Sequence, residues 1–335
     1  MDARIAKLKI IACFLVILLH VSAEQAMKFG AGWWASNIYD SLARVCVPIF
    51  LMISGALLLK KSEPLGSFIS KRFIRIFPPL LFWSAFYVWW LYFNGVDVSG
   101  WALRLLTEPA MYHLWYLYAI IGVYALVPIL RRFYNGSTMS EKLWALSLWI
   151  IVGSVWPAVS LLASSPQSCI AIAPTGTASF YHLSTFGGYA GFLLLGAFLS
   201  DMKINRKLGA IMFGAGSLAT MILMHWHSVR VGRPCETFYN YLSPLVIFSA
   251  VGFFSYFMSV VPQTPSKLLA RAADCTLGIY CLHIVLIGGI FPMFGLSALG
   301  ANVWFMTPIV SVLAFCVSML IIYIARLTAP GRFVT

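Results

Sequence analysis

Long runs of apolar residues fill most of the chain, and short clusters of charged and turn-forming residues separate them. A helix needs roughly 20 largely apolar residues to cross a bilayer, whereas a membrane β-strand shows about ten alternating ones. The runs are too long and too continuous for strands. The pattern therefore predicts an all-α, polytopic membrane protein with about ten transmembrane helices, at 8–24, 38–59, 74–94, 112–130, 143–163, 181–200, 208–226, 241–261, 276–294 and 304–325.

Composition supports this prediction and excludes other classes of protein. Of the 335 residues, 61% are hydrophobic and only 10% are charged, whereas a soluble domain carries roughly a quarter of charged residues. The net charge of +13 does not indicate nucleic-acid binding, because the cations are spread thinly between the apolar runs. Since no repeat or low-complexity tract interrupts the pattern, we expect a single integral-membrane domain over residues 1–335.

The basic residues predict the orientation of the spans, because cytoplasmic loops of membrane proteins are enriched in lysine and arginine. With a cytoplasmic N-terminus, eighteen basic residues face the cytoplasm and four face the outside, which places both termini in the cytoplasm. The cytoplasmic set is Arg4, Lys7, Lys9, Lys60, Lys61, Lys71, Arg72, Arg75, Arg131, Arg132, Lys142, Lys203, Arg206, Lys207, Lys267, Arg271, Arg326 and Arg332, and the external set is Lys28, Arg104, Arg230 and Arg233.

The seven cysteines contain no C-x-x-C pair and form no cluster with histidine at zinc-binding spacing. Most of them lie within apolar runs, where a cysteine acts as a small buried hydrophobic residue. We therefore expect neither a disulfide framework nor a bound metal.

Ionisable residues inside the spans are candidates for function, because burying a charge in the bilayer is costly. Lys9 and His20 lie eleven residues apart in the first span, so a helix carries them roughly 16 Å apart on nearly the same face. An imidazole can act as a base near neutral pH, and Glu24, one turn further, can orient it. A hydrogen-bonded histidine near the lipid headgroups is the alternative interpretation.

Arg44 lies in the second span at a depth similar to that of His20. It can hold a carboxylate, a phosphate or an acyl carbonyl, or it can form a structural ion pair with Asp40 four residues earlier. Arg72 and Arg75 share a helix side at the inner face and can bind phosphates, although plain topological charge also explains them. Pro78 and Pro79 indicate a helix start or a break after this pair.

His113 begins the fourth span, where it can approach the outer half of the first span or belong to an interfacial aromatic belt. His283 lies one or two turns in from the cytoplasmic side of its span. Phosphate-binding loops, G-x-S-x-G elbows and H-E-x-x-H motifs do not occur, which argues against ATP-driven transport, serine hydrolases and zinc proteases.

In order, these motifs resemble those of the membrane-bound acyltransferase family 3, which transfers acyl groups to glycans and other acceptors. The resemblance covers nearly the whole chain. After the first-span histidine it rests on S-x-A-R-V-x-V-P-I-F-L-M-I-S-G (41–55), K-R-F-I-R-I-F-P-P (71–79), Y-H-L-W-Y-L-Y-A-I (112–120) and L-G-I-Y-C-L-H (277–283). Within the family the chain looks most similar to the enterobacterial type that O-acetylates the common antigen polysaccharide.

The resemblance implies a multi-pass acyltransferase of the bacterial inner membrane that binds no cofactor permanently and uses acetyl-CoA as co-substrate. It implies His20 and Arg44 as catalytic residues, and Lys9, Arg72 and Arg75 as the donor site. Lys9 stands where the family has an arginine, which keeps the charge but loses the bidentate fork. Glu24, His113, Trp115 and His283 are then expected on the acceptor side or beside the catalytic residues.

The expected partners are membrane lipids, an acyl-CoA and a glycan or lipid-linked saccharide acceptor, and no nucleic acid. A transporter or flippase for a lipid-linked saccharide is the competing prediction, because it also needs ten spans and a few buried charges. Paired halves with interrupted helices are typical of transporters, and the sequence shows no such symmetry. The sequence identifies neither the acceptor nor the acyl group, and leaves open whether His20 acts as a base or as an acyl carrier.

Overall fold

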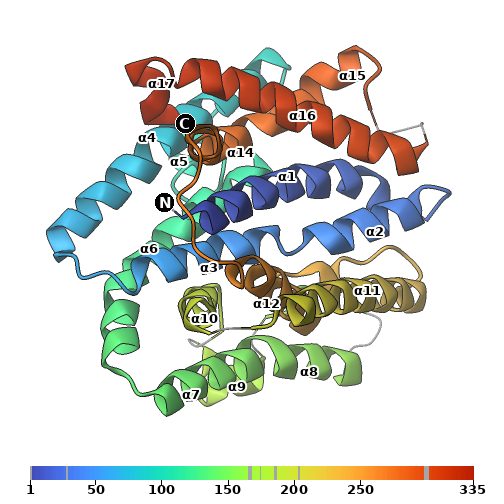
Figure 1. Cartoon of the computed structure of the whole chain (residues 1–335). Coiled ribbons are helices and arrows are strands. Elements are labelled where there is room, and N and C mark those ends of the chain that lie inside the picture. The colour runs from blue at the N-terminus through green and yellow to red at the C-terminus, as the bar shows by residue number, and fades with distance from the viewer. Residues whose placement is uncertain are drawn as a thin grey trace.

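A computed structural model describes residues 2–27, 29–164, 168–173, 175–184, 187–202, 204–297 and 302–335. Every regular element in these ranges is a helix (Figure 1), so the predicted all-α membrane fold is confirmed. The α-helices are α1 (Ala3–Ala26), α2 (Trp33–Ala43), α3 (Cys46–Leu58), α4 (Leu65–Phe93), α5 (Trp101–Arg104), α6 (Trp115–Gly136), α7 (Met139–Ile150), α8 (Trp156–Ser164), α9 (Gly176–Phe180), α10 (Ala190–Asp201), α11 (Arg206–Val231), α12 (Pro244–Met258), α13 (Lys267–Asp274), α14 (Thr276–Val285), α15 (Phe291–Met293), α16 (Val303–Ala325) and α17 (Ala329–Val334). Short 3₁₀ segments η1 (Tyr112–Leu114) and η4 (Thr237–Tyr239) precede α6 and α12, and π-helical turns η2 (Ile151–Val155) and η5 (Leu286–Ile290) continue α7 and α14.

Nine of the ten predicted spans are helices long and apolar enough to cross a membrane, within the part of the chain that the structure describes. The exception is the predicted span 181–200, where α10 has only 12 residues. Twelve residues rise about 18 Å, which is less than the roughly 30 Å of a bilayer core. Gly188, whose φ is 153°, lies just before this helix.

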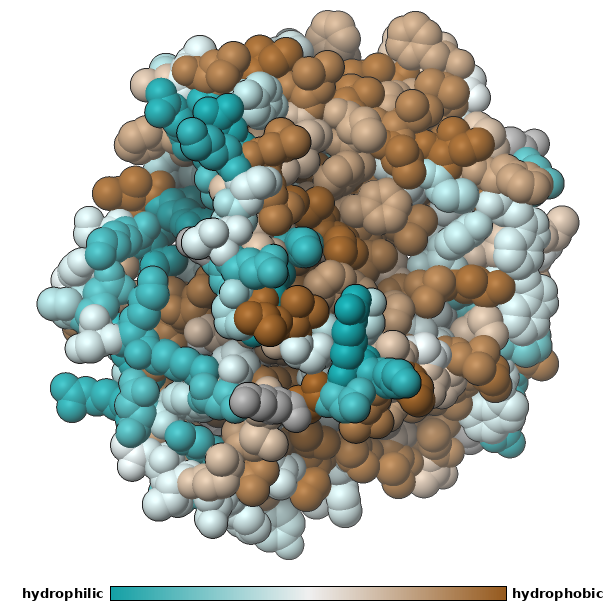
Figure 2. All heavy atoms as spheres, in the orientation of Figure 1, coloured by the Kyte–Doolittle hydropathy of each residue, from teal (hydrophilic) through white to brown (hydrophobic). Residues whose placement is uncertain are grey.

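Helix α1 lies in the middle of the bundle, with α2, α3, α13, α14 and α16 packed around it (Figure 1). The long helices alternate in direction, so the connections fall at two ends of the bundle. We call the end that holds Arg4, Lys60 and Arg75 the basic end, and the end that holds the Cys169–Cys235 disulfide the disulfide end. Figure 2 shows hydrophilic residues gathered on one side of the molecule and a largely hydrophobic surface beside them. Lys28 and Lys203, two of the residues used to predict orientation, lie outside the described residues.

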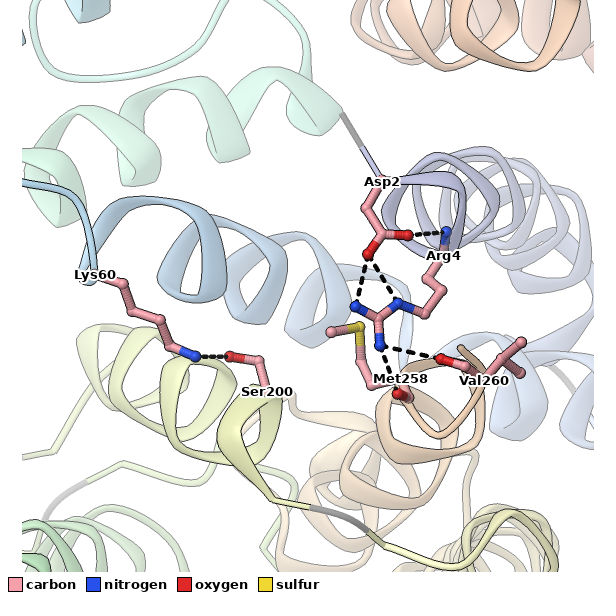
Figure 3. Close-up of polar contacts among 6 residues, drawn as sticks. All are labelled: Asp2, Arg4, Lys60, Ser200, Met258 and Val260. Carbon is pink, nitrogen blue, oxygen red and sulfur yellow. Dashed lines mark hydrogen bonds and ion pairs between the residues drawn. The ribbon is translucent and has the colours of Figure 1, made fainter. Parts of the chain in front are cut away.

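Hydrogen bonds and ion pairs connect neighbouring helix ends at the basic end (Figure 3). Arg4 forms an ion pair with Asp2 and donates to the carbonyls of Met258 and Val260, at 2.9 and 3.1 Å, where α12 ends. Lys60 donates to Ser200 Oγ at 2.7 Å and also pairs with Asp201. These contacts satisfy carbonyls and charges at helix ends, where the backbone has no partner of its own.

Helices α3 and α10 cross with their backbones in contact because each presents a glycine to the other. A Cβ on Gly196 would overlap the backbone of Met52, and a Cβ on Gly55 would overlap the backbone of Leu193. Small residues at crossings allow membrane helices to pack closely, since lipid supplies no hydrophobic drive for association. Gly191 similarly faces the Trp149 ring, so the glycines of this segment pack helices within one chain.

We expect Gly196→Ala to lower stability by roughly 1–3 kcal/mol, because the added methyl group forces α3 and α10 apart. Gly214→Ala is the matched control, since a Cβ there meets no atom within 4 Å and alanine favours a helix. Thermal unfolding of both variants in detergent measures the difference. Equal unfolding temperatures for the two variants would contradict the backbone contact.

Candidate active site

Three histidines from distant parts of the chain meet inside the bundle: His20 of α1, His113 of η1 and His283 of α14. The ring centroids of His20 and His283 are 5.2 Å apart, and those of His113 and His283 are 5.3 Å apart. His113 is 1% exposed and His283 is fully buried, while His20 is partly exposed. The sequence singled out all three residues, and the structure brings them together.

His283 lies deeper in the bundle than its distance from the start of α14 suggests. The Cys13 thiol donates to the Thr276 carbonyl at 3.4 Å, so α14 begins at the level of Cys13 and not at the end of α1. Seven residues then separate Cys13 from His20, and seven separate Thr276 from His283. Equal rise along the two helices places both imidazoles at the same depth.

Backbone carbonyls fix the tautomers of two of these histidines. His283 Nδ1 lies 2.6 Å from the Tyr280 carbonyl, and His113 Nε2 lies 3.2 Å from the Cys281 carbonyl. Since a carbonyl only accepts, each of these nitrogens carries its hydrogen. The other nitrogens, His283 Nε2 and His113 Nδ1, are buried and have no hydrogen-bond partner among the described residues. The cluster therefore holds two unshared imidazole lone pairs next to His20.

Tyrosines hold this arrangement in place. Tyr87 donates its hydroxyl to the Cys281 carbonyl at 2.7 Å, and the Tyr280 hydroxyl donates to the His113 carbonyl. Tyr112 packs edge-on against His20, with centroids 5.4 Å apart. The sequence did not predict the roles of these tyrosines, because each of these contacts joins residues that are far apart in the chain.

Glu24 does not orient His20 in this structure. The carboxylate is exposed, and no hydrogen bond or ion pair joins it to His20 within the described ranges. One helical turn carries Glu24 beyond the cluster, toward the disulfide end.

Arg44 forms the buried ion pair with Asp40 that the sequence left as the structural alternative. Its Nε lies 2.6 Å from Asp40 Oδ1 and its Nη2 lies 2.7 Å from Oδ2, a two-pronged contact. The guanidinium also lies over the Tyr239 ring, 4.4 Å from the centroid. Nη1 has no acceptor among the residues described, and the residue lines a pocket at the disulfide end.

Pro48 explains why Arg44 lies where it does. Proline has no N–H for the carbonyl four residues earlier, which is that of Arg44, and its ring crowds that carbonyl. The predicted span 38–59 therefore breaks at Arg44 and Val45, between α2 and α3. The break places Arg44 at the end of one helix and directs α3 toward the basic end.

A cavity of about 150 Å³ opens beside α1 and contains all three predicted donor residues in its lining. Lys9, Arg72 and Arg75 contribute the charge, while Tyr116 and Tyr280 line it with their rings. Tyr280 also packs against His113, with centroids 5.6 Å apart. One cavity wall thus connects the three cations with the histidine cluster.

The three cations lack ion-pair partners, unlike their neighbours. Within the described part of the chain, no carboxylate lies within 4 Å of Lys9, Arg72 or Arg75, although Asp274 acts on Lys9 at longer range. Lys71, in contrast, holds Glu63 at 2.6 Å, and this contact lowers the pKa of the Glu63 carboxyl. Unpaired cations around a cavity are suited to an anionic group such as a phosphate.

Helix α4 corrects the interpretation of Pro78 and Pro79. The helix neither starts nor breaks there, but runs from Leu65 to Phe93 with both prolines inside it. Arg72 and Arg75 lie within the two turns before Pro78, so the basic pair lies on a continuous helix. The carbonyls of Ile74 and Arg75 lose their normal helical donors to the two prolines.

The cysteine prediction was wrong in one respect, because Cys169 and Cys235 form a disulfide. Cysteine spacing gave no signal for it, since 66 residues separate the two. Four of the other cysteines, Cys13, Cys46, Cys275 and Cys281, are buried as free thiols, as expected of small apolar residues.

Comparisons with known proteins agree with the geometry at the level of the family. No curated protein and no solved structure matches the chain. The family model described as "Acyltransferase domain" matches residues 3–326, which is nearly the whole chain and includes every candidate residue named above. The chain therefore belongs to acyltransferase family 3 and is a membrane acyltransferase.

Proposed function

We propose that this acyltransferase is an O-acetyltransferase that moves an acetyl group from cytoplasmic acetyl-CoA to a hydroxyl of a cell-envelope glycan or lipid-linked sugar. The observation that carries the proposal is the cavity beside α1. Its lining includes three unpaired cations at the basic end and Tyr280, whose ring packs against His113 in the cluster of histidines with free lone pairs. The cations can bind the phosphates of the donor, and the histidines can accept a proton during the transfer step.

We further propose that the basic end faces the cytoplasm of a bacterial inner membrane. Lysine and arginine are enriched on the cytoplasmic side. Disulfides persist in oxidising compartments such as the bacterial periplasm, and Cys169–Cys235 lies at the opposite end of the bundle. Charge and disulfide are independent of each other, and they favour the same orientation, with both termini cytoplasmic.

The donor site follows from the spacing along α1. Lys9, Arg72 and Arg75 bind the phosphates of acetyl-CoA, and the pantetheine arm extends along the cavity. Eleven residues separate Lys9 from His20, which is about 16 Å along the helix axis. The thioester then reaches the histidine cluster while the charged part of the donor stays at the basic end.

His20 acts as the general base in this proposal. It takes the proton of the acceptor hydroxyl while the hydroxyl oxygen forms a bond to the acetyl carbonyl carbon. The carbon–sulfur bond then breaks, and the departing thiolate takes the proton from the imidazolium. If His20 itself carries the acetyl group, its ring nitrogen attacks the same carbonyl carbon first, and the carbon–sulfur bond breaks with release of the thiolate. The acceptor oxygen then displaces the imidazole from that carbon, and the acceptor proton passes to the thiolate.

His283 is a positioning residue in this scheme. Its Nδ1–H is fixed by the Tyr280 carbonyl, so its bare Nε2 can accept a hydrogen from His20 and set the His20 tautomer. Arg44 is directed by Asp40 toward the disulfide end, which favours a role beside the acceptor or the developing oxyanion over a role in donor phosphate binding.

We predict that His20→Ala abolishes acetyl transfer, with a loss of at least roughly 10²–10⁴-fold, because the proton acceptor is gone. Membranes incubated with radiolabelled acetyl-CoA provide the measurement, as label on envelope glycans. His225→Ala is the control, since this histidine packs on Trp34 away from the cluster. An active His20→Ala protein at normal abundance would exclude the assigned role.

Lys9→Arg should retain transfer, because it preserves the cation at the cavity, and Lys9→Glu should raise the KM for acetyl-CoA strongly by repelling phosphate. Lys7→Glu is the matched control on the same helix, since Lys7 is exposed and does not line the cavity. Initial rates over a range of acetyl-CoA concentrations separate these cases. Similar KM values for Lys9→Arg and Lys9→Glu would remove Lys9 from the donor site.

The assay also separates the enzyme from the transporter or flippase predicted as the alternative. Label on a glycan or on the protein supports acyl transfer, whereas a translocated but unmodified saccharide supports transport. Mass analysis of envelope glycans from cells with and without the gene would then identify the acceptor, with the enterobacterial common antigen as the first candidate.

A further inference from the structure

A second pocket, of about 330 Å³, lies at the disulfide end and is separate from the donor cavity. Five segments that are far apart in sequence form its walls: the α2–α3 junction, the start of α6, residues 169–171, the residue before α10 and the turn around η4. Its lining consists of Arg44, Trp115, Cys169, Ile170, Ala171, Tyr189, Glu236, Thr237, Tyr239, Asn240 and Tyr241.

Three aromatic rings of the pocket lining pack against one another. Trp115 and Tyr241 are nearly parallel, with an interplanar angle of 19° and centroids 5.9 Å apart, and Tyr189 lies 5.7 Å from Trp115. No side-chain hydrogen bond engages the Trp115 indole N–H or the hydroxyls of Tyr189 and Tyr241 within the described residues. Each ring thus offers an apolar face together with an unused polar group.

The lining of the pocket also carries polar groups, among them one acidic and one basic residue. Glu236 is exposed and forms no ion pair with a described residue. Asn240 accepts from the Leu242 amide at 2.8 Å through Oδ1, which leaves its NH₂ group for another partner. Arg44 contributes donors. Mixed donors and acceptors suit a neutral ligand with several hydroxyls better than an anion, and aromatic faces suit the C–H faces of a sugar ring.

The Cys169–Cys235 disulfide forms part of the same pocket. Cys169 lines it directly, and Cys235 precedes the lining residue Glu236. The Cys235 amide donates to Ser228 Oγ at 3.1 Å, which ties this cysteine to the end of α11. The disulfide therefore fixes residues 169–171 against the turn that carries Glu236 and Tyr241.

We propose that this pocket binds a pyranose ring of the acceptor, and that the disulfide preserves the shape of the binding site. Trp115 is two residues from His113, and its ring lies 6.1 Å from that of Tyr116. Tyr116 packs in turn on Tyr280, which contacts His113, so the pocket lies close to the histidine cluster. The assignment of the ring as an acceptor rests on the proposed function. Binding of the ring itself does not, because it needs no acyl donor.

The test measures sugar binding without acetyl-CoA. The full chain is placed in lipid nanodiscs, because detergents with sugar headgroups would compete, and N-acetylglucosamine is the probe in saturation-transfer NMR. We expect N-acetylglucosamine to bind saturably to the unmodified protein. Glycerol, which has hydroxyls but no ring, should not bind. Glu236→Ala and Tyr241→Ala should each weaken binding roughly fivefold or more, through a lost charged hydrogen bond or a lost ring face.

Matched controls are Glu108→Ala and Tyr181→Ala, which remove exposed residues outside the pocket and should change binding less than about twofold. Unchanged binding in Glu236→Ala and Tyr241→Ala, or no binding to the unmodified protein, would overturn the proposal. The binding measurement contains no acyl donor, so it is independent of the transfer assay. Loss of sugar binding alone contradicts the proposed pocket, and loss of acetyl transfer alone contradicts the proposed function.

A second measurement tests the disulfide. Dithiothreitol reduces Cys169–Cys235 to two thiols while it becomes a cyclic disulfide. We expect this treatment and the Cys169→Ser/Cys235→Ser double variant to weaken sugar binding to a similar extent. Dithiothreitol should have no further effect on the double variant, which keeps the five free cysteines. Full binding by the double variant would show that the disulfide does not preserve the site.

Discussion

The buried ion pair between Asp40 and Arg44 is the contact on which both cavities depend. Its two short contacts compensate two charges in an apolar bundle, where an unpaired charge would cost several kcal/mol. The pair also holds the Arg44 side chain at the end of α2, where Pro48 interrupts the helix. Beyond the break, residues of α3 such as Val47, Phe50 and Ser54 line the donor cavity, while Arg44 itself lines the pocket at the disulfide end. One junction therefore positions walls of both sites.

Polar side chains around this pair extend the same constraint to other helices. Asn37 donates to the Met221 carbonyl of α11 at 3.1 Å, and the Tyr239 hydroxyl donates to Asn37 Oδ1 at 2.5 Å. Water is absent from the bilayer core, so such groups must find partners within the protein. The network connects α2 to α11 and to the turn before α12, so Tyr239 of the second pocket lies against the Arg44 guanidinium.

Much of this arrangement could be predicted from the sequence, because helix formation and the depth of a residue within a span depend on residues that are close in the chain. Apolar runs predicted ten spans, of which nine are long helices in the described part of the chain, and the depth of His20 and His113 predicted that they can approach the same region. The rest depends on contacts between distant segments. Neither the depth of α14, set by Cys13 and Thr276, nor the Cys169–Cys235 disulfide has a signature in residue spacing. Pro78 and Pro79 were misinterpreted because neighbouring helices in a membrane tolerate prolines that a local rule treats as helix ends.

On the proposed function, the two cavities explain how the donor and the acceptor can stay on opposite sides of the membrane. A nucleotide with several phosphates is too polar to enter an apolar bundle, and the unpaired cations hold it at the basic end. The acceptor ring, rich in hydroxyls, fits the mixed polar and aromatic pocket at the other end. Only the small, uncharged acetyl group needs to reach the level of the histidines. Helix α1 sets that distance, because it carries Lys9 at the donor cavity and His20 in the histidine cluster.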